Sequence, residues 1–384
     1  MKLTNFIKDF KDISIASSRD NKSILTFYSQ SKMENSGNSI YYDRKPNFFS
    51  FYEQELSDVY VLLLRSPSDQ KIEGIAVINK HERFLEGKCV KVCLLSDLRI
   101  STKRASAIWK NYYRDFIDNL NNIDEFCDVS LCYTYILDQN KRAISSLNNP
   151  SNEFTYNLRA SYNMVNIFNF SGTEVSPDIK MTTIFNESEL VNFLNHEHSK
   201  LNLGLNYPKE YMYRKANWNA ANFSKEVVVI KNSKIVAYTK LQSIDHLKKI
   251  IIPNLSPLQK TYYSIIKCFR KEAPQLKEEL RPLHLTSLTL SSTLSDKDVN
   301  HVLNILISNI FTKGYVKNFH CLSVVPPSYK GIRWNNGFNH FFTLNTKAHL
   351  FTVESTKFNI SKDSKDSKDS KDLKSPFFIE LCLI

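Results

Sequence analysis

The sequence predicts an α/β protein with two similar domains in tandem, each a mostly antiparallel mixed sheet flanked by helices. The prediction rests on the 384-residue length, a 42% hydrophobic and 12% aromatic composition, and an order of segments that occurs twice. One hydrophobic core rarely grows beyond about 250 residues. We therefore expect an N-terminal domain at 1–175, a C-terminal domain at 176–358 and a tail at 359–384.

The first domain is predicted to begin with one strand and two helices. Ile13–Ala16 is strand-like, Asp20 is a candidate helix N-cap, and apolar residues through Tyr28 recur with a helical period. A second helix is expected over Pro46–Leu56, because proline is favoured in the first helical turn.

A hairpin and further alternating elements complete this domain. The β-rich runs Val59–Arg65 and Ile72–Asn79 flank the turn-forming residues 66–70, which indicates an antiparallel hairpin. There follow a long strand at Lys88–Ile100, a helix with one apolar face over Ala105–Leu120, a strand at Val129–Ile136, a short helix at Asn140–Leu147 and closing strands within Phe154–Phe170.

The same order returns from Met181 onwards, with one charged, helix-like insertion at about 256–280. This repetition is the main evidence for two domains. The predicted elements are a strand at Met181–Phe185, helices from Glu187 and over Pro208–Ala216, a hairpin of Glu226–Ile230 with Lys234–Gln242, a strand at Leu283–Leu290, a helix capped by Asp296, a strand at Phe319–Val325, a short helix near Ser328–Asn335, and a hairpin of His340–Asn345 with His349–Glu354.

The tail differs from the rest of the chain. Ser361–Asp372 repeats Ser-Lys-Asp four times with nothing apolar to bury, which predicts a disordered tether. A short apolar segment follows Pro376, and we expect it to dock on the body or on a partner.

Several classes of protein and site are excluded. No apolar run approaches the ~18 residues of a membrane helix, and the N-terminus has no secretory apolar segment, so we expect a cytoplasmic protein without a membrane partner. With eight glycines, the chain has no P-loop and no G-x-G-x-x-G. The seven cysteines form no C-x-x-C pair, and His196 and His198 would point to different faces of a helix, so no metal is expected.

Two short segments, together with the element order, resemble the GNAT superfamily of N-acetyltransferases. Leu94–Arg104 resembles the family's fourth strand and pyrophosphate loop, usually written L-x-x-L-x-V-x-P-x-x-R and continued by R-x-x-G-x-G/A. Asp138–Ala143 resembles the N-x-x-A segment after the fifth strand. The chain departs from the family at Ala107 and Trp109, which replace the glycines, and at Leu147, which replaces a tyrosine that acts as general acid.

The resemblance implies an N-acyltransferase that moves an acetyl or other acyl group from coenzyme A to an amine of a small molecule or peptide. Asp97 would be a candidate general base, while Leu98 and Ile100 would offer backbone groups to the acyl and pantetheine parts of the donor. The other implied donor-binding residues are Arg99, Asn140 and a helix start that would hold the diphosphate, made of Arg104, Ala105, Ser106, Ala107, Ile108 and Trp109.

Two alternatives stay open. The missing glycines and tyrosine favour a catalytically degenerate GNAT-like protein that binds a protein or nucleic acid. The net charge of +12 would suit a Fem-type transferase, also tandem and GNAT-like, which takes aminoacyl-tRNA. The basic residues are dispersed, which speaks against a dedicated RNA-binding module. The sequence indicates neither the acceptor nor the oligomeric state.

Overall fold

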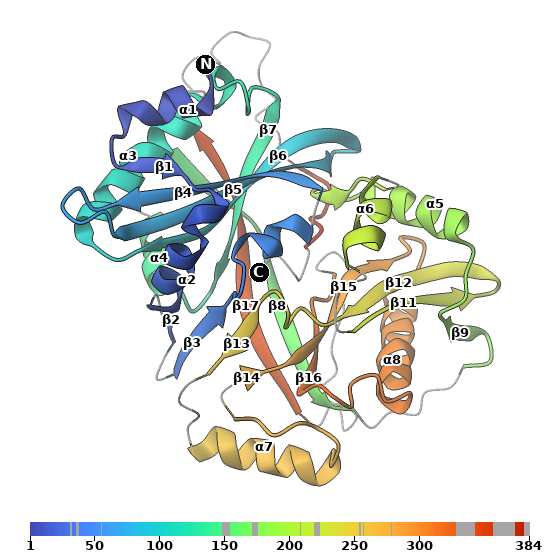
Figure 1. The fold of residues 1–384 in the computed structure, drawn as a ribbon. Helices are drawn as coiled ribbons and strands as arrows, with labels where there is room; N and C mark the ends of the chain where they lie inside the picture. Colours follow the sequence, from blue (N-terminus) through green and yellow to red (C-terminus); the bar gives the residue numbers. More distant parts are fainter. Residues whose placement is uncertain are drawn as a thin grey trace.

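The last strand of each half of the chain extends into the sheet of the other half. The protein is described by a computed structural model that covers residues 1–30, 33–35, 38–54, 56–147, 154–170, 176–207, 209–218, 223–252, 255, 257–277, 279–327, 342–355 and 373–379. Thirteen of the described strands belong to one sheet, which continues through both halves (Figure 1).

The strands follow one another in the sheet in the order β1-β4-β5-β6-β7-β17-β8-β16-β15-β12-β11-β9, and β10 pairs with β5. From the first half come β1 (Ile13–Ile15), β4 (Ser57–Arg65), β5 (Ile72–Leu85), β6 (Lys88–Ile100), β7 (Val129–Leu137) and β8 (Phe154–Asn169). From the second come β9 (Ile179–Thr182), β10 (Gly204–Leu205), β11 (Ser224–Lys231), β12 (Lys234–Gln242), β15 (Pro282–Leu290), β16 (Cys321–Val324) and β17 (Phe342–Ser355).

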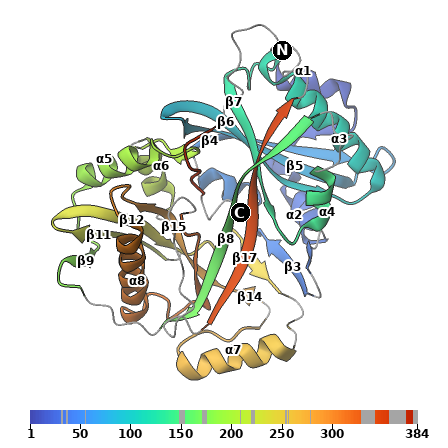
Figure 2. The same ribbon diagram turned by 180° about the vertical axis from the view of Figure 1, so that it is seen from behind.

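The long strands β8 and β17 run side by side through the centre of both views (Figures 1 and 2). On its other edge β17 pairs with β7, where Leu350 lies opposite Tyr135, whereas β8 pairs with β16, where Val165 lies opposite Val324. The hairpin predicted from His340–Asn345 and His349–Glu354 is therefore wrong, because residues 342–355 form one continuous strand. No glycine or proline interrupts it, and its residues 345–349 pair with Val165 to Ser161 of β8.

Helices cover both faces of the first-half sheet. α1 (Leu3–Phe6) and α3 (Lys103–Asp118) pack on one face, where α3 buries Ala105, Trp109 and Phe116 at four- and seven-residue steps. On the other face lie α2 (Asn21–Gln30) and the 3₁₀ helix η3 (Phe49–Gln54). The remaining short elements of this half are η1 (Ile7–Asp9), η2 (Ser18–Asp20), η4 (Leu120–Asn122) and α4 (Lys141–Leu147).

Two predicted helix starts differ from the structure. The helix expected over Pro46–Leu56 begins only at Phe49, because the N–H groups of Phe48 and Phe49 donate to the side chains of Asn21 and Asn47. At the other end of the chain the cap is Ser295 rather than Asp296, since the Ser295 side chain accepts from the N–H of Asp298.

In the second half, α8 (Asp296–Thr312) packs into an apolar core on one face of the sheet, and α5 (Glu187–His198) and α6 (Lys209–Trp218) cover the other. The predicted insertion contains α7 (Pro257–Phe269), which packs on Phe168 of β8. The arrangement of helices on both faces of a mixed, mostly antiparallel sheet is as predicted.

A second, smaller sheet also joins the two halves. Its order is β14-β13-β3-β2, with β2 (Met33–Asn35) and β3 (Asn38–Asp43) from the first half and β13 (Lys249–Ile251) and β14 (Glu279–Leu280) from the second. The antiparallel pair of β3 and β13 ends with Asp43 opposite Lys249. The small sheet thus holds chain segments from opposite halves, those next to Asp43 and Lys249, near one another.

The apolar end of the tail docks on the body, one of the two outcomes expected. Phe377 and Phe378 are buried, and Asn202 exchanges backbone hydrogen bonds with Pro376 and Phe378. The Ser-Lys-Asp repeats and the helix predicted near Ser328–Asn335 lie outside the described residues. The domain boundaries stay predictions. Among the described helices, none has the length and apolar character needed to cross a membrane.

The exchange of β17 predicts that neither half is stable alone. We expect residues 1–175 by themselves to show no cooperative thermal transition, because β17, which pairs with both β7 and β8, is missing. Coexpression with residues 176–384 should restore one transition, measured by circular dichroism together with size-exclusion chromatography. A cooperative transition of 1–175 alone, close to that of the intact chain, would contradict this account.

Candidate functional site

A cavity opens where β6 and β7 separate. Their parallel pairing runs from Lys91 opposite Val129 to Leu94 opposite Tyr133, with no pair beyond. Past this point, residues 95–100 of β6 and 134–137 of β7 line a cavity of about 410 Å³. The facing strand edges carry peptide groups without a partner on the opposite strand, and such groups bind an amide-containing ligand well.

The cavity brings together seven of the eleven predicted site residues. Arg104, Ala105, Ala107 and Ile108 do not line it. The predicted residues that do are Asp97, Leu98, Arg99, Ile100, Ser106, Trp109 and Asn140. The other described lining residues are Leu94, Leu95 and Ser96 of β6, Thr134–Leu137 of β7, Lys110 and Tyr113 of α3, Ala143 and Ser146 of α4, and Tyr42, Arg44, Phe51, Tyr52, Asn79, Tyr156 and Lys248.

A β-bulge in β6 borders the cavity. Ile75 of β5 lies opposite Arg99 and Val77 lies opposite Ser96, so Ala76 faces both Asp97 and Leu98. Asp97 has a positive φ of 51°. Because a bulge leaves one residue unpaired and turns the strand, it frees backbone groups at 97–98 beside the cavity. This is where the sequence predicted backbone contacts from Leu98.

The second half has the same bulge, and the cavity that the described residues form beside it is much smaller. Ser287 of β15 has φ 52°, and the pairing of β12 with β15 shifts at this point. The cavity that Ser287 lines has a volume of about 10 Å³. The β15–β16 pairing also stops early, at His284 opposite Ser323. Leu285 and Leu288 of β15 and Val324 of β16 are buried with α8 in one apolar core.

Asp97 is held in a polar cluster on the face of β6 that also bears α2 and η3. Its Oδ2 lies 2.8 Å from Nη2 of Arg44 and accepts a hydrogen bond from the Tyr52 hydroxyl. Its Oδ1 accepts from the Tyr28 hydroxyl at 2.9 Å, and that hydroxyl accepts from Nη2 of Arg99 at 2.9 Å. Burial alone would raise the pKa of Asp97, but the charges of Arg44 and Arg99 lower it to about 2.

These contacts fix the Asp97 carboxylate in place. A carboxylate with a pKa of about 2 and both oxygens engaged is poorly suited to accept a proton at neutral pH. The Asp97 side chain is only 13% exposed. The general-base role stays a prediction that the geometry does not favour.

The start of α3 is basic. Thr102 caps the helix by accepting from the N–H of Ala105, the first turn carries Lys103 and Arg104, and no acidic residue lies in that turn. The helix dipole and the Lys103 side chain make this end attractive to an anion. In contrast, the first turn of α8 carries Asp296 and Asp298.

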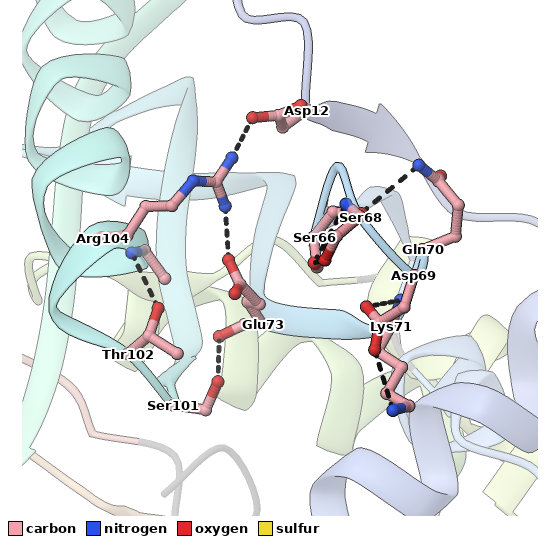
Figure 3. A network of polar contacts seen from close by, with 11 residues as sticks. Asp12, Ser66, Ser68, Asp69, Gln70, Lys71, Glu73, Ser101, Thr102 and Arg104 are labelled. Carbon is pink, nitrogen blue, oxygen red and sulfur yellow. Dashed lines mark hydrogen bonds and ion pairs between the residues drawn. The ribbon is translucent and has the colours of Figure 1, made fainter.

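Arg104 itself is directed away from the predicted diphosphate contact. Figure 3 shows its guanidinium extended between the carboxylates of Asp12 and Glu73, with which it forms ion pairs. It thus joins the start of α3 to the residue before β1 and to β5. A side chain held by two carboxylates is a structural tie, so the diphosphate role implied for Arg104 is not supported.

Trp109 and Asn140 also take structural roles beside the cavity. Trp109 is 1% exposed and packs in the core next to Gly74, where an added Cβ would lie 2.2 Å from the indole Nε1. This close approach explains a tryptophan at a position where the family has a small residue. Asn140 caps α4, because its Oδ1 accepts from the N–H of Ala143.

Sequence reasoning missed two cations, Arg44 and Lys248. They lie outside any motif and come from opposite halves of the chain, so no local pattern links them. The one signal was the aromatic run Phe48-Phe49-Ser50-Phe51-Tyr52 after Arg44, whose rings at positions 48, 51 and 52 surround that guanidinium.

The described residues contain no group of His, Cys, Asp or Glu side chains arranged to hold a metal ion. His198 has a structural role, since its Nδ1 accepts from the N–H of Leu205 and its Nε2 bonds the hydroxyl of Thr289. The six described cysteines are free thiols.

No protein-family model matches the chain, and no curated protein matches it. Several solved structures do match the chain. Saccharomyces cerevisiae N-myristoyltransferase with bound myristoyl-CoA superposes with a TM-score of 0.56 and 10% identity over 90% of this chain and 79% of that one. A second structure of that protein, with myristoyl-CoA and inhibitors, gives 0.57 and 9% identity over 89% and 80%. A GCN5-related N-acetyltransferase from Anabaena variabilis gives 0.49 and 8% over 89% and 72%.

The likeness to N-myristoyltransferase confirms the predicted fold. The chain has the tandem GNAT-like fold of that protein, over nearly its whole length.

Asp97→Asn should lower the free energy of unfolding by at least about 2 kcal/mol at pH 7. The carboxyl has a pKa of about 2 when folded against an ordinary 3.8, so its stabilisation is present above pH 4 and is lost as the pH falls towards 2. Urea unfolding of both proteins at several pH values measures the difference.

Asp138→Asn is the matched control. A hydrogen bond from His349, with one from Lys141, lowers the pKa of Asp138 to about 2 as well, but this carboxylate is exposed and screened by solvent. We expect a much smaller effect. Equal effects of the two substitutions, or a pH-independent effect at Asp97, would contradict the assignment.

Proposed function

We propose that this protein is an acyl-CoA-dependent N-acyltransferase whose first half binds the donor between β6 and β7. The observation that carries the proposal is the coincidence of three features at one cavity: separated parallel strands, the bulge at Asp97 and the N-terminal part of α3, where Ser106 and Lys110 line the cavity. The fold shared with an enzyme that binds myristoyl-CoA supports it.

In this proposal the donor's diphosphate lies at the first turn of α3. The N–H groups of this turn and the helix dipole attract it, and Lys110 adds a cation one turn beyond Ser106, since both line the cavity. The missing glycine at Ala107 is tolerated, because this side chain is exposed and does not line the cavity. The pantetheine would bind the free edges of β6 and β7.

The second half is not proposed to bind a donor. Asp296 and Asp298 already complement the dipole of α8, and their charges would repel a diphosphate. Leu285, Leu288 and Val324, next to the end of the β15–β16 pairing, are buried in one apolar core with α8. One donor per chain follows.

Catalysis in this site would depend mainly on positioning. The neutral amine attacks the thioester carbon, the new C–N bond forms as the C–S bond breaks, the amine loses a proton and the thiolate gains one. Among the described lining residues there is no histidine and Asp97 is the one carboxylate, so we expect water to accept the amine's proton. Burial raises the pKa of Tyr113 and Tyr156, so both hydroxyls stay protonated and can donate a hydrogen bond to the leaving thiolate, which takes its proton from water.

The acyl group is proposed to be acetyl or another short chain. Val92, Tyr133 and Phe377 are buried together at the end of the cavity where β6 and β7 begin to separate. The cavity of about 410 Å³ is near the lower end of ligand sites and must hold both reacting groups. The cytoplasmic location and a tRNA partner stay predictions.

The proposal predicts saturable binding of acyl-CoA, measured by isothermal titration calorimetry with acetyl-, octanoyl- and myristoyl-CoA. Ser106→Asp should weaken binding by about tenfold or more, because it places a carboxylate at the proposed diphosphate site. Ser106→Asn is the isosteric neutral control and should bind like the unchanged protein. Ser106 is exposed, so neither variant should unfold the chain.

We expect acetyl-CoA to bind at least as tightly as myristoyl-CoA. Tighter binding of myristoyl-CoA would overturn the short-chain assignment alone. No binding of any of the three at millimolar concentration, or equal binding by both Ser106 variants, would overturn the proposed donor site.

A further inference from the structure

We propose that the amine acceptor of this cavity carries a carboxylate, which binds between Arg44 of the first half and Lys248 of the second. This inference rests on the proposed function and names the class of its acceptor: an amino acid or a short peptide with a free carboxylate.

The small sheet brings the two cations together. Asp43 of β3 lies opposite Lys249 of β13 in the last pair of these antiparallel strands, and Arg44 and Lys248 are the residues that come next on each side of that pair. Both cations contact the same ring: the guanidinium carbon of Arg44 lies 4.2 Å from the centre of the Phe51 ring, and Nζ of Lys248 lies 5.2 Å from the same centre. Two like charges held this near one ring favour an anionic ligand beside them.

Both cations are buried, and part of Arg44 has no partner. Arg44 is 4% and Lys248 is 6% exposed, and both line the cavity. Nη2 of Arg44 binds Asp97, whereas its Nε and Nη1 are buried without a hydrogen-bond partner among the described residues. Leaving charged donors buried and unpaired is costly, so a site with two such nitrogens is suited to a carboxylate ligand.

The charges of the lining residues support an anionic ligand. Four cationic side chains, Arg44, Arg99, Lys110 and Lys248, and one carboxylate, Asp97, line the cavity within the described part of the chain. Asp97 already receives two tyrosine hydroxyls and Arg44.

The anion at Arg44 is distinct from the diphosphate of the donor. Arg44 contacts Asp97 at the bulge, whereas the proposed diphosphate site begins after Thr102. Five extended residues separate these positions, which corresponds to about 16 Å along the strand. One phosphate group cannot reach both places, so the anion at Arg44 belongs to the acceptor.

The acceptor would thus be held by its carboxylate beside the bulge, with its amine facing the thioester. The amine nitrogen forms the new bond to the acyl carbon, coenzyme A leaves as the thiolate, and the proton lost by the nitrogen balances the one the thiolate gains. The products are an N-acylated amino acid or peptide and free coenzyme A.

The test compares acceptors in matched pairs: proteinogenic amino acids and alanine dipeptides, each as the free acid and as the C-terminal amide. Acetyl-CoA is the donor, and release of free thiol is the readout. We expect kcat/KM to be at least about 30-fold higher for the acid of the best pair.

Lys248→Met should raise the acceptor KM by tenfold or more and leave the affinity for acetyl-CoA unchanged, as measured by calorimetry. Lys225→Met is the matched control, because Nζ of Lys225 lies 4.6 Å from the Tyr315 ring in the second half, much as Nζ of Lys248 lies 4.4 Å from Tyr42. It should behave like the unchanged protein. If Arg44→Met alone fails to fold, Arg44→Met combined with Asp97→Asn removes the ion pair as a unit and should abolish the preference for the acid.

Different results would overturn the acceptor class and the proposed function. Acetyl-CoA binding and amine transfer with equal rates for acids and amides, or an unchanged preference in both Lys248→Met and the double variant, would overturn this inference alone. An unchanged protein that binds no acyl-CoA would overturn the proposed function and the inference with it.

Discussion

The pairing of β17 with β7 is the constraint on which the site depends. After Tyr133, β7 is no longer paired with β6, but it stays paired with β17 as far as Leu137, which lies opposite Ala348. A strand of the second half of the chain thus stays paired with β7 along the cavity of the first half. The same interlocked strands explain how the two halves share one sheet.

The two halves keep the same backbone feature and differ in the chemistry around it. Asp97 and Ser287 both have a positive φ at a bulge in the corresponding strand. Around the first bulge lie a cavity and a basic helix start, whereas the second borders a filled core and a helix that starts with two aspartates. The second half instead contributes β17 and Lys248 to the site of the first. We infer that the first half forms the cavity and that the second half contributes residues to it.

Much of the architecture could be predicted from the sequence because it follows from local periodicity. The run of β-favouring residues at Val59–Arg65 and the three- and four-residue steps of α3 indicate their elements without tertiary information. Strand 342–355 could not be predicted as one strand, since its continuity depends on pairing with β7 and β8. The arrangement of the site also depends on residues distant in sequence. Asp12 and Glu73 hold Arg104. A pair of strands from opposite halves brings the segments of Arg44 and Lys248 near each other.

Hydrogen–deuterium exchange with and without acetyl-CoA tests the central claim most directly, because it locates the donor on the intact chain. The account predicts slower exchange in residues 95–106 and 134–143, at the free edges of β6 and β7 and the start of α3, and no change in residues 285–300. Protection confined to residues 285–300, or no protection at saturating donor, would contradict a donor site in the first half.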